Sequence, residues 1–553
     1  MCRFRMRLTA LLLFGLLLSF TAAAEGGADG SGTTGAARLE LFTTADRCQA
    51  CHNGLTDGAG RDLSIGSDWS ASMMANSARD PYWHAAVRRE VTDHPTLGAA
   101  IEDECSKCHM PMARFAIHTA GGQGPVFDHL GPAPAAAVSA THALDGASCT
   151  LCHQIQPDKL GERESFVGGF VIDTATPPGQ RKVFGPYDVD AGRQRLMRSA
   201  SRFEQGESTH VQGSELCATC HTLFTHAYGP DGKVIGELPE QVPYLEWQHS
   251  AYDGKQDCQD CHMLSTENVA MSSVWGQPRD TIRPHVFRGG NFLMLRMLAG
   301  HRVPQQVQAS PRELGAAAER TVEHLQSSSA DVSLSCAGVS GGRLEVEVTV
   351  TNLAGHKLPT AYPSRRAWLH LTVTDAADRL LFESGMLQPD GAIAGNDNDA
   401  DPARYEPHHP LIDQPDKVQI YEAILGSPDG TVTTGLLTAT RYLKDNRLLP
   451  RGFDAKSASA NIAVQGAATT DADFTAEGDR IRYSVAVGDS EGPYRVRAEL
   501  LYQSIGYRWA HNLAPYDAAE PQRFVAYYRE AAGDSAVSLA SQEILVGAGA
   551  ARP

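Results

Sequence analysis

The sequence predicts a chain of more than one domain, in which a helical and loop-rich N-terminal part is followed by an antiparallel β-sandwich. Three observations carry this prediction. Between residues 40 and 305, the pattern Cys-x-x-Cys-His occurs five times among turn residues and short helical pieces such as Trp83–Thr92. A capping-box sequence begins a helix at residue 310, and beyond residue 330 apolar and polar residues alternate with a period of two.

Residues 1–24 have the order of a secretory signal peptide. Three arginines, at positions 3, 5 and 7, precede the apolar run Leu11–Leu18, and Ala22–Ala24 provides a cleavage site before Glu25. Residues 25–39 are rich in Gly, Ala, Ser and Thr and predict a flexible lead-in. No later stretch reaches the roughly 18 consecutive apolar residues of a membrane-spanning helix, so we expect an exported chain without a transmembrane segment.

The five cysteine motifs have more than one chemical interpretation. A Cys-x-x-Cys pair can ligate zinc or exchange disulfides, whereas Cys-x-x-Cys-His is the attachment signature of c-type haem, in which both thiols form thioethers and the imidazole ligates the iron. Zinc would not require a histidine after every second cysteine, and a thioredoxin-like site predicts one pair in a βαβ unit. The repeated pattern therefore favours five covalent haem c groups, with these cysteines and proximal histidines: Cys48, Cys51 and His52; Cys105, Cys108 and His109; Cys149, Cys152 and His153; Cys217, Cys220 and His221; Cys258, Cys261 and His262.

Haem also explains why residues 40–305 lack an ordinary apolar core, because the cofactors would supply it. We therefore expect a haem-cored, mostly α-helical and loop multihaem cytochrome c domain here. Bacterial c-type haem is attached after export, which places the chain in a periplasm or outside the cell.

A connector of residues 306–329 should follow, because Ser310-Pro311-Arg312-Glu313 is a capping box with proline at the first helical position, and the helix should run to about Gln326. The β-sandwich domain is expected over residues 330–548, which contain no haem motif. Its half-buried strands are predicted from alternation in four runs: Leu344–Val350, Trp368–Val373, Arg480–Val487 and Tyr494–Leu500.

The net charge of −17 argues against nucleic-acid binding, which needs a basic surface, and is compatible with a basic redox partner. Ten of the twelve cysteines lie in motifs and Cys2 leaves with the signal peptide. The remaining thiol, Cys336, is in a strand-like stretch and is expected to be a buried small hydrophobic residue, with intermolecular pairing as the alternative.

The sixth coordination position of each iron decides between a closed electron carrier and an open, reactive haem. His142 and His210 precede Cys149 and Cys217 by the same interval, and His249 precedes Cys258 by a slightly longer one, which predicts a weak internal repeat of distal ligands. Surface histidines are the alternative interpretation. Other histidines of this part, and the methionines that could replace histidine as ligands, are His84, His94, His118, His129, His226, His285, His301, Met73, Met74, Met110 and Met112.

Residues 40–300 resemble bacterial multihaem c-type cytochromes with a cytochrome c-552/4-like haem domain. The runs that carry this resemblance are Glu215–Leu223, Tyr244–Ser250, Cys258–Met263 and His285–Asn291. The resemblance implies histidine-capped haems that transfer electrons, and it favours His249 and His285 as distal ligands. Thr351–Thr360 resembles a Gly-His-Lys-x-Pro-Thr turn of β domains appended to such cytochromes, in which His356 could cap a haem; a hydrogen-bonded turn histidine is the alternative.

Asp397, Asp399 and Asp401 alternate in one loop, with Glu406 nearby, and such oxygen donors can surround calcium. The EF-hand pattern is not met, and a solvated acidic turn is the alternative.

Three functions remain open. The first is an exported pentahaem electron carrier between a redox protein donor and acceptor, with mainly bis-histidine haems. The second is an oxidoreductase acting on a small nitrogen or sulfur species at one open haem, with a nearby His or Arg as proton donor. In the third, the β domain is only a docking module. We favour the first, because candidate distal histidines outnumber the haems. The sequence does not decide the oligomeric state.

Overall fold

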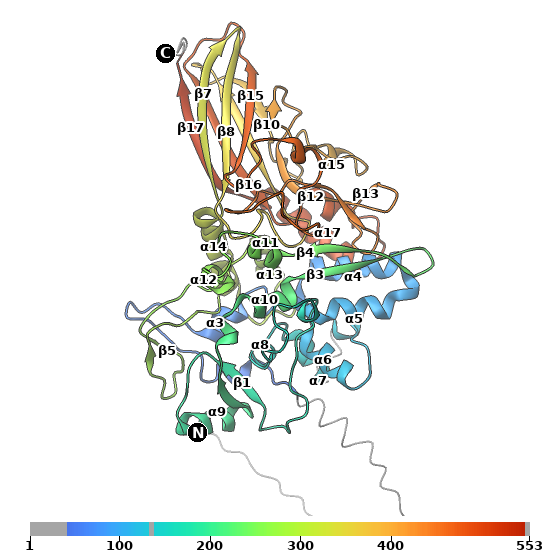
Figure 1. Cartoon of the computed structure of the whole chain (residues 1–553), viewed down its shortest axis with the longest axis vertical. Coiled ribbons are helices and arrows are strands. Elements are labelled where there is room, and N and C mark those ends of the chain that lie inside the picture. The colour runs from blue at the N-terminus through green and yellow to red at the C-terminus, as the bar shows by residue number, and fades with distance from the viewer. Residues whose placement is uncertain (1–40, 132–137, 548–553) are drawn as a thin grey trace, which may run out of the picture.

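The computed structural model describes residues 41–131 and 138–547. The predicted signal peptide and the whole of the lead-in lie outside the described residues. Short helices gather at one end of the molecule and long strands at the other (Figure 1). Among the helices of the described ranges, none combines the length and the apolar character needed to cross a membrane.

The first part of the chain is built from short helices joined by irregular segments. Its apolar clusters are small and separate, such as one around Phe42, Leu151 and Phe170 and another around Trp83, Ile101 and Met110. The helices are α2 (Asp46–Gln49), α3 (Ile65–Ser70), α4 (Pro81–Asp93), α5 (Gly98–His109), α6 (Pro111–Thr119), α7 (Val138–Leu144), α8 (Cys149–Cys152), α9 (Ala191–Ser201), α10 (Ser214–His221), α11 (Pro243–Gln248), α12 (Cys258–His262) and α13 (Phe292–Gly300).

Three two-stranded ribbons interrupt these helices. They pair β1 (Lys182–Gly185) with β2 (Glu204–Glu207), β3 (Leu223–Tyr228) with β4 (Val234–Gln241), and β5 (Val269–Ala270) with β6 (Pro278–Arg279). The first pair is parallel and the other two are antiparallel.

Helix α14 (Pro311–Ser328) lies where the capping box predicts a helix and ends two residues beyond the expected Gln326. The Ser310 hydroxyl accepts a hydrogen bond from the backbone N–H of Glu313, and the Glu313 carboxylate accepts one from the backbone N–H of Ser310 (2.7 Å). Its buried residues, such as Leu314, Ala318 and Leu325, recur with helical spacing and join the main core.

Two sheets follow α14. Three of the four predicted alternating runs lie wholly in their strands, and the fourth, Arg480–Val487, extends one residue beyond β15. Strand β8 alternates between half-buried and buried positions along its whole length, as the sequence predicts. One sheet has the order β11-β15-β8-β7, and the other β13-β12-β9-β16-β17, with β10 beside β9 and β14 beside β12. The pairs are antiparallel except β11 with β15. The strands are β7 (Ala330–Ser340), β8 (Arg343–Asn352), β9 (Arg366–Thr374), β10 (Leu380–Ser384), β11 (Leu411–Ile412), β12 (Ile420–Gly426), β13 (Val432–Thr433), β14 (Arg441–Asp445), β15 (Asp479–Ala486), β16 (Tyr494–Gln503) and β17 (Ala536–Val546), with helices α15 (Asp397–Ala400), α16 (Tyr507–His511) and α17 (Ala519–Ala531) between them.

One large apolar core joins the two sheets to the helical part. It includes Val348 of β8, Leu371 of β9 and Phe292 of α13. Polar contacts reinforce this junction: Arg88 of α4 pairs with Glu520 of α17 (2.9 Å). The β part is therefore packed directly against the segment that carries the cysteine motifs.

Cys336 lies half-buried on β7, packed against the main core, and its thiol donates a hydrogen bond to the Glu345 carbonyl (3.3 Å).

Candidate haem-binding site

Each Cys-x-x-Cys-His motif lies in or beside a short helix. Residues i, i+3 and i+4 share one face of a helix, so both thiols and the imidazole of a motif can point in the same direction. Helices α5 and α10 end on the motif histidines His109 and His221, and α12 consists of Cys258–His262 alone. The two thiols and the imidazole of each motif can therefore hold one cofactor from the same side.

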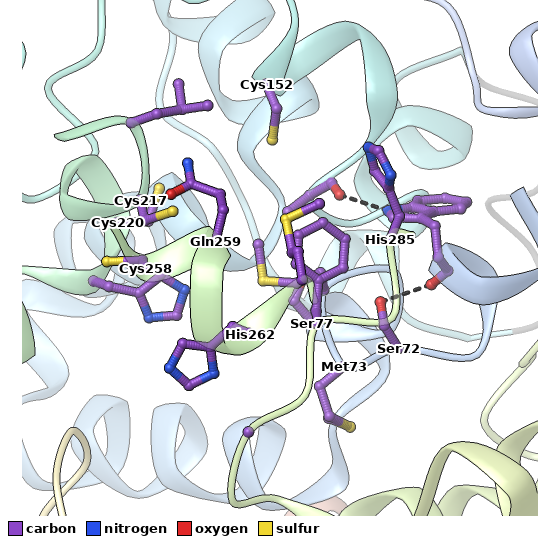
Figure 2. A pocket seen from close by; sticks show the side chains of 18 of the residues that line it. Ser72, Met73, Ser77, Cys152, Cys217, Cys220, Cys258, Gln259, His262 and His285 are labelled. Carbon is purple, nitrogen blue, oxygen red and sulfur yellow. Dashed lines mark hydrogen bonds between the residues drawn. The ribbon is translucent and has the colours of Figure 1, made fainter. Parts of the chain in front are cut away.

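One continuous cavity connects the five motifs. Its volume of about 1780 Å³ exceeds the roughly 300–1,000 Å³ of a typical pocket for one small ligand. All ten motif cysteines and all five motif histidines line it, and Figure 2 shows Cys152, Cys217, Cys220, Cys258 and His262 around one part of it. The β part contributes to the walls, for example through Tyr502. The cavity has the size and the attachment groups for several large cofactors.

Four of the five motif histidines, all except His221, are held in the manner of metal ligands. A ring whose Nδ1–H donates to a backbone carbonyl presents the Nε2 lone pair to a metal. Burial lowers the pKa of these histidines, for His109 and His262 to about 4, and therefore keeps them in the neutral form that ligation requires. The Nδ1 contacts are His52 with Met271 O (2.6 Å), His109 with Ser77 O (3.0 Å), His153 with Phe184 O (2.6 Å) and His262 with Arg288 O. These residues fit covalently attached haem.

Two motif histidines face a second imidazole across the cavity. The ring centres of His153 and His285 are 6.2 Å apart and those of His262 and His356 are also 6.2 Å apart, with interplanar angles of 22° and 13°. Two metal–nitrogen bonds of about 2 Å each, plus the ring radii, separate the centres of two axial imidazoles by about 6 Å. Nδ1 of His285 contacts the Arg283 carbonyl (3.1 Å) and Nδ1 of His356 contacts the Lys357 carbonyl (2.8 Å). Both rings leave Nε2 available to a metal.

The other three predicted distal ligands do not line this cavity. Both nitrogens of His210 are engaged, by Ser208 Oγ (2.6 Å) and the Ile155 carbonyl (2.8 Å), and Nε2 of His249 contacts the Asp454 carbonyl (2.8 Å). His142 lines a separate cavity of about 300 Å³, with its Nδ1 buried and without a hydrogen-bond partner. The regular interval from these histidines to the next motif therefore does not bring them to the cavity that the cysteines share.

A buried network of charges fixes the turn that carries His356. The Lys357 ammonium is fully buried and bonds to Asp445 (2.7 Å), and Arg447 bridges Asp445 (2.8 Å) and Glu246 of α11 (2.9 Å). Glu246 also accepts hydrogen bonds from the Lys357 backbone N–H (3.1 Å) and the Thr360 hydroxyl. The Gly-His-Lys-x-Pro-Thr turn is thus bound to a helix of the cysteine-bearing part.

Several cysteines of different motifs lie next to each other. The thiol of Cys48 interacts with that of Cys149, the thiol of Cys108 with that of Cys220, and the thiol of Cys217 with that of Cys258. Cys152 also lies near Cys220. The fourth motif therefore neighbours the second, third and fifth, and the first motif neighbours the third. This order differs from the order along the chain.

The wall beside Cys105 carries ionisable groups that sequence patterns did not indicate. Glu240 is buried, accepts a hydrogen bond from the Thr225 hydroxyl (2.5 Å), and burial together with the nearby Glu90 raises its pKa to about 7. The hydroxyl groups of Tyr82 and Tyr362 lie 3.5 Å apart on the same cavity. Motifs have fixed spacing, whereas these groups come from separate helices, ribbons and loops, so no local signal identifies them.

The methionines divide into two groups. Met73 and Met74 line the cavity, and Figure 2 shows Met73 in the same part of it as His262 and His285 without contact between them. Met110 and Met112 are fully buried in the small apolar clusters and do not line it. His324 of α14 also lines the cavity, with its ring centre 5.8 Å from that of His262. The sequence predicts α14 as a connector between the two parts of the chain. Its histidine, His324, comes close to His262 only in the folded chain.

The structure does not gather Asp397, Asp399 and Asp401 around one point. Asp399 is buried and pairs with Arg366 (2.8 Å), Asp397 pairs with Arg404 (2.6 Å), and Asp401 accepts a hydrogen bond from the backbone N–H of Ala403 (2.9 Å). Each carboxylate already has its own partner, so this loop does not form the calcium site that alternation suggested.

No protein-family model and no curated protein sequence matches the chain. A solved structure that does match is the penta-heme cytochrome c552 from Thermochromatium tepidum, with a TM-score of 0.50 and 15% sequence identity. The match covers 92% of this chain and 100% of that one. The chain therefore has a fold similar to that of this cytochrome.

Proposed function

We propose that the chain is an exported multihaem c-type cytochrome that binds five haem c groups and transfers electrons between a redox donor and an acceptor protein. The observation that carries this proposal is the shared cavity, into which all ten motif cysteines and all five motif histidines open. Thioethers from each cysteine pair would hold the cofactors, and the fold shared with a penta-heme cytochrome supports the same conclusion.

Bis-histidine ligation is proposed for two of the haems. His153 with His285 would ligate one iron, and His262 with His356 the other, since both pairs have the separation of axial ligands. In these pairs the protein holds each ring by its Nδ1 and so fixes its orientation. Two protein nitrogens on one iron close it to substrates and favour electron transfer.

The contacts between motifs support a branched relay. The fourth motif would hold the central haem, with the second, third and fifth as neighbours, and the first would connect through the third. Electrons could then enter and leave at the three outer haems, of the first, second and fifth motifs. The division into a haem domain of residues 40–305, a connector and a β-sandwich domain remains part of this proposal.

A second candidate function is reduction or oxidation of a small nitrogen or sulfur species at one open haem. Within the described residues, no second imidazole is paired with His52, His109 or His221, and the observation that favours this candidate lies beside the second motif, where Glu240 and the Tyr82–Tyr362 pair line the cavity. A buried carboxyl with a pKa near neutrality is suited to proton transfer.

Electron paramagnetic resonance of the oxidised protein, with a haem-to-protein ratio, tests the proposal. We expect five haems per chain, and the haems ligated by the His153–His285 and His262–His356 pairs should give low-spin signals that do not change when cyanide, nitrite or hydroxylamine is added. A high-spin signal that shifts with these ligands would favour the second candidate, and a ratio clearly below five would contradict the attachment of haem at every motif.

A further inference from the structure

The β part contains a cluster of carboxylates that takes no part in the haem cavity. Asp471 and Asp473 lie in the loop before β15, and Asp479 is the first residue of that strand. His408, from the loop before β11, contacts Asp471 and Asp479, and the Asp473 carboxyl group lies beside that of Asp471. One ligand atom each of His408, Asp471 and Asp479 lies within 4.8 Å of the others, and none of the four side chains lines the haem cavity.

Two carboxylate oxygens of this cluster are buried without a hydrogen-bond partner, Oδ1 of Asp473 and Oδ1 of Asp479. The Asp479 side chain is 0% exposed, and its Oδ1 lies 3.8 Å from Nε2 of His408. Its other oxygen, Oδ2, accepts hydrogen bonds from the Tyr421 hydroxyl (2.7 Å) and from Gln419 Nε2 (3.1 Å). A buried carboxylate is costly unless it is paired or coordinates a metal, so these two oxygens indicate a missing cation.

The hydrogen bonds of His408 determine which kind of cation fits. Gln419 Oε1 accepts from the His409 backbone N–H (2.8 Å), so the amide nitrogen of Gln419 faces Nδ1 of His408 (2.8 Å). The Asn446 side chain also directs its amide nitrogen at Nδ1 (3.1 Å), because its oxygen accepts from a backbone N–H. Nδ1 is therefore an acceptor, and the ring proton is on Nε2.

Nε2 thus faces the carboxylates as a donor, 3.2 Å from Asp471 Oδ2, and has no lone pair for a metal. Zinc, copper and nickel prefer imidazole ligands, and His408 cannot ligate them in this orientation, so the site does not suit these metals. Only oxygen atoms remain as donors, and calcium is the cation that takes six to eight oxygen ligands in flexible geometry. Arg480, which lies 3.6 Å from Asp473, offsets only part of the negative charge.

We propose that Asp471, Asp473 and Asp479 bind a calcium ion, while His408 donates a hydrogen bond to Asp471. The ion would join the loop of residues 471–473 to the start of β15, next to the edge strand β11 with which β15 pairs. Calcium would then act on the stability of the β part and not on the haems.

Elemental analysis of the purified holoprotein, after dialysis against calcium-free buffer, tests this site. We expect one calcium per chain in the wild type and almost none in Asp479→Asn or Asp473→Asn. A calcium chelator should lower the melting temperature of the wild type by about 5 °C and have little effect on either variant, because the ion binds only the folded state. Asp473 is partly exposed, so we expect Asp473→Asn to fold. This variant provides the test if Asp479→Asn does not fold.

Asp397→Asn is the matched control, because Asp397 belongs to the other acidic loop and is already paired with Arg404. It should keep its calcium and its response to the chelator. The proposal is overturned if the wild type holds no calcium and its melting temperature does not respond to millimolar calcium, if zinc is bound in its place, or if Asp397→Asn loses the ion.

Discussion

His285 and His356 occupy equivalent positions although they come from different parts of the chain. Each places its ring centre 6.2 Å from that of a motif histidine, and each uses its Nδ1 to contact a backbone carbonyl. A single side chain in each case would decide whether an iron is closed to small ligands.

Replacing either residue by alanine should change one haem only. In His285→Ala and His356→Ala we expect one haem to become high spin and to bind cyanide, with the covalent haem content unchanged, because the thioethers remain. Optical and electron paramagnetic resonance spectra measure both properties. His249→Ala is the control, since its Nε2 already contacts the Asp454 carbonyl, and its spectra should equal those of the wild type. Unchanged spectra in His285→Ala or His356→Ala would remove that residue from the ligand set.

The attachment residues could be assigned from sequence, but most distal positions could not. Cys-x-x-Cys-His is a local pattern, and its spacing already places three groups on one helical face. A distal ligand is set by which segments meet across the cavity, and a constant interval to the next motif does not encode that. The resemblance indicated His249, His285 and His356, and the interval indicated His142, His210 and also His249. Of these five histidines, His285 and His356 line the cavity.

At the scale of elements, the turn of residues 352–360 and helix α11 form one unit. The Lys357 ammonium, the Arg447 guanidinium and the carboxylates of Asp445 and Glu246 connect them, and all four side chains are buried. This arrangement explains why the turn needs lysine and threonine beside the histidine.

Lys357→Met should therefore destabilise the chain strongly. The substitution leaves the buried Asp445 carboxylate with Arg447 only, and breaking a buried ion pair costs about 3–5 kcal/mol. Thermal unfolding measures the loss, and the spectrum of the haem facing His356 should broaden. Lys417→Met is the control: Lys417 pairs with Asp413 at the same distance of 2.7 Å, but both side chains are more than one-third exposed. Its cost should stay below about 1 kcal/mol. Equal effects in the two variants would contradict the role of the buried network.

The elements themselves follow from local sequence to different degrees. The capping box placed the start of α14, and alternation placed β8, β9, β15 and β16. Strand β12, by contrast, is buried at every position, so its sequence shows no alternation that would predict a half-buried strand. The pairing order of the sheets depends on contacts between distant segments, which periodicity does not record.

At the scale of the whole molecule, buried carboxyls make stability depend on pH. Burial, with the nearby Glu90, raises the pKa of Glu240 to about 7, and burial raises that of Asp80 to about 6. A raised pKa means that the folded state keeps a proton that the unfolded chain releases. The protonated Glu240 therefore contributes to the free energy of unfolding. This stabilising contribution is fully present below about pH 4.5 and is lost as the pH rises to about 7.

The variant Glu240→Gln should remove this dependence. We expect Glu240→Gln to gain stability relative to the wild type as the pH rises from about 5 to 8, with a slope of up to about 1.4 kcal/mol per pH unit for the difference. Melting temperatures of both proteins across this range provide the measurement. A constant difference between them would show that Glu240 does not change its charge in the window.

The cavity wall supplied by the β part has a consequence for biogenesis. Covalent attachment requires that an enzyme reach each cysteine pair, whereas in the folded chain these cysteines line a cavity whose walls the β part helps to form, and all of them except Cys261 are half-buried. The β part is the last to be synthesised, and domains generally fold as units in the order of synthesis. Haem attachment would therefore precede the packing of the C-terminal sheets, which would then cover the cavity after the haems are bound.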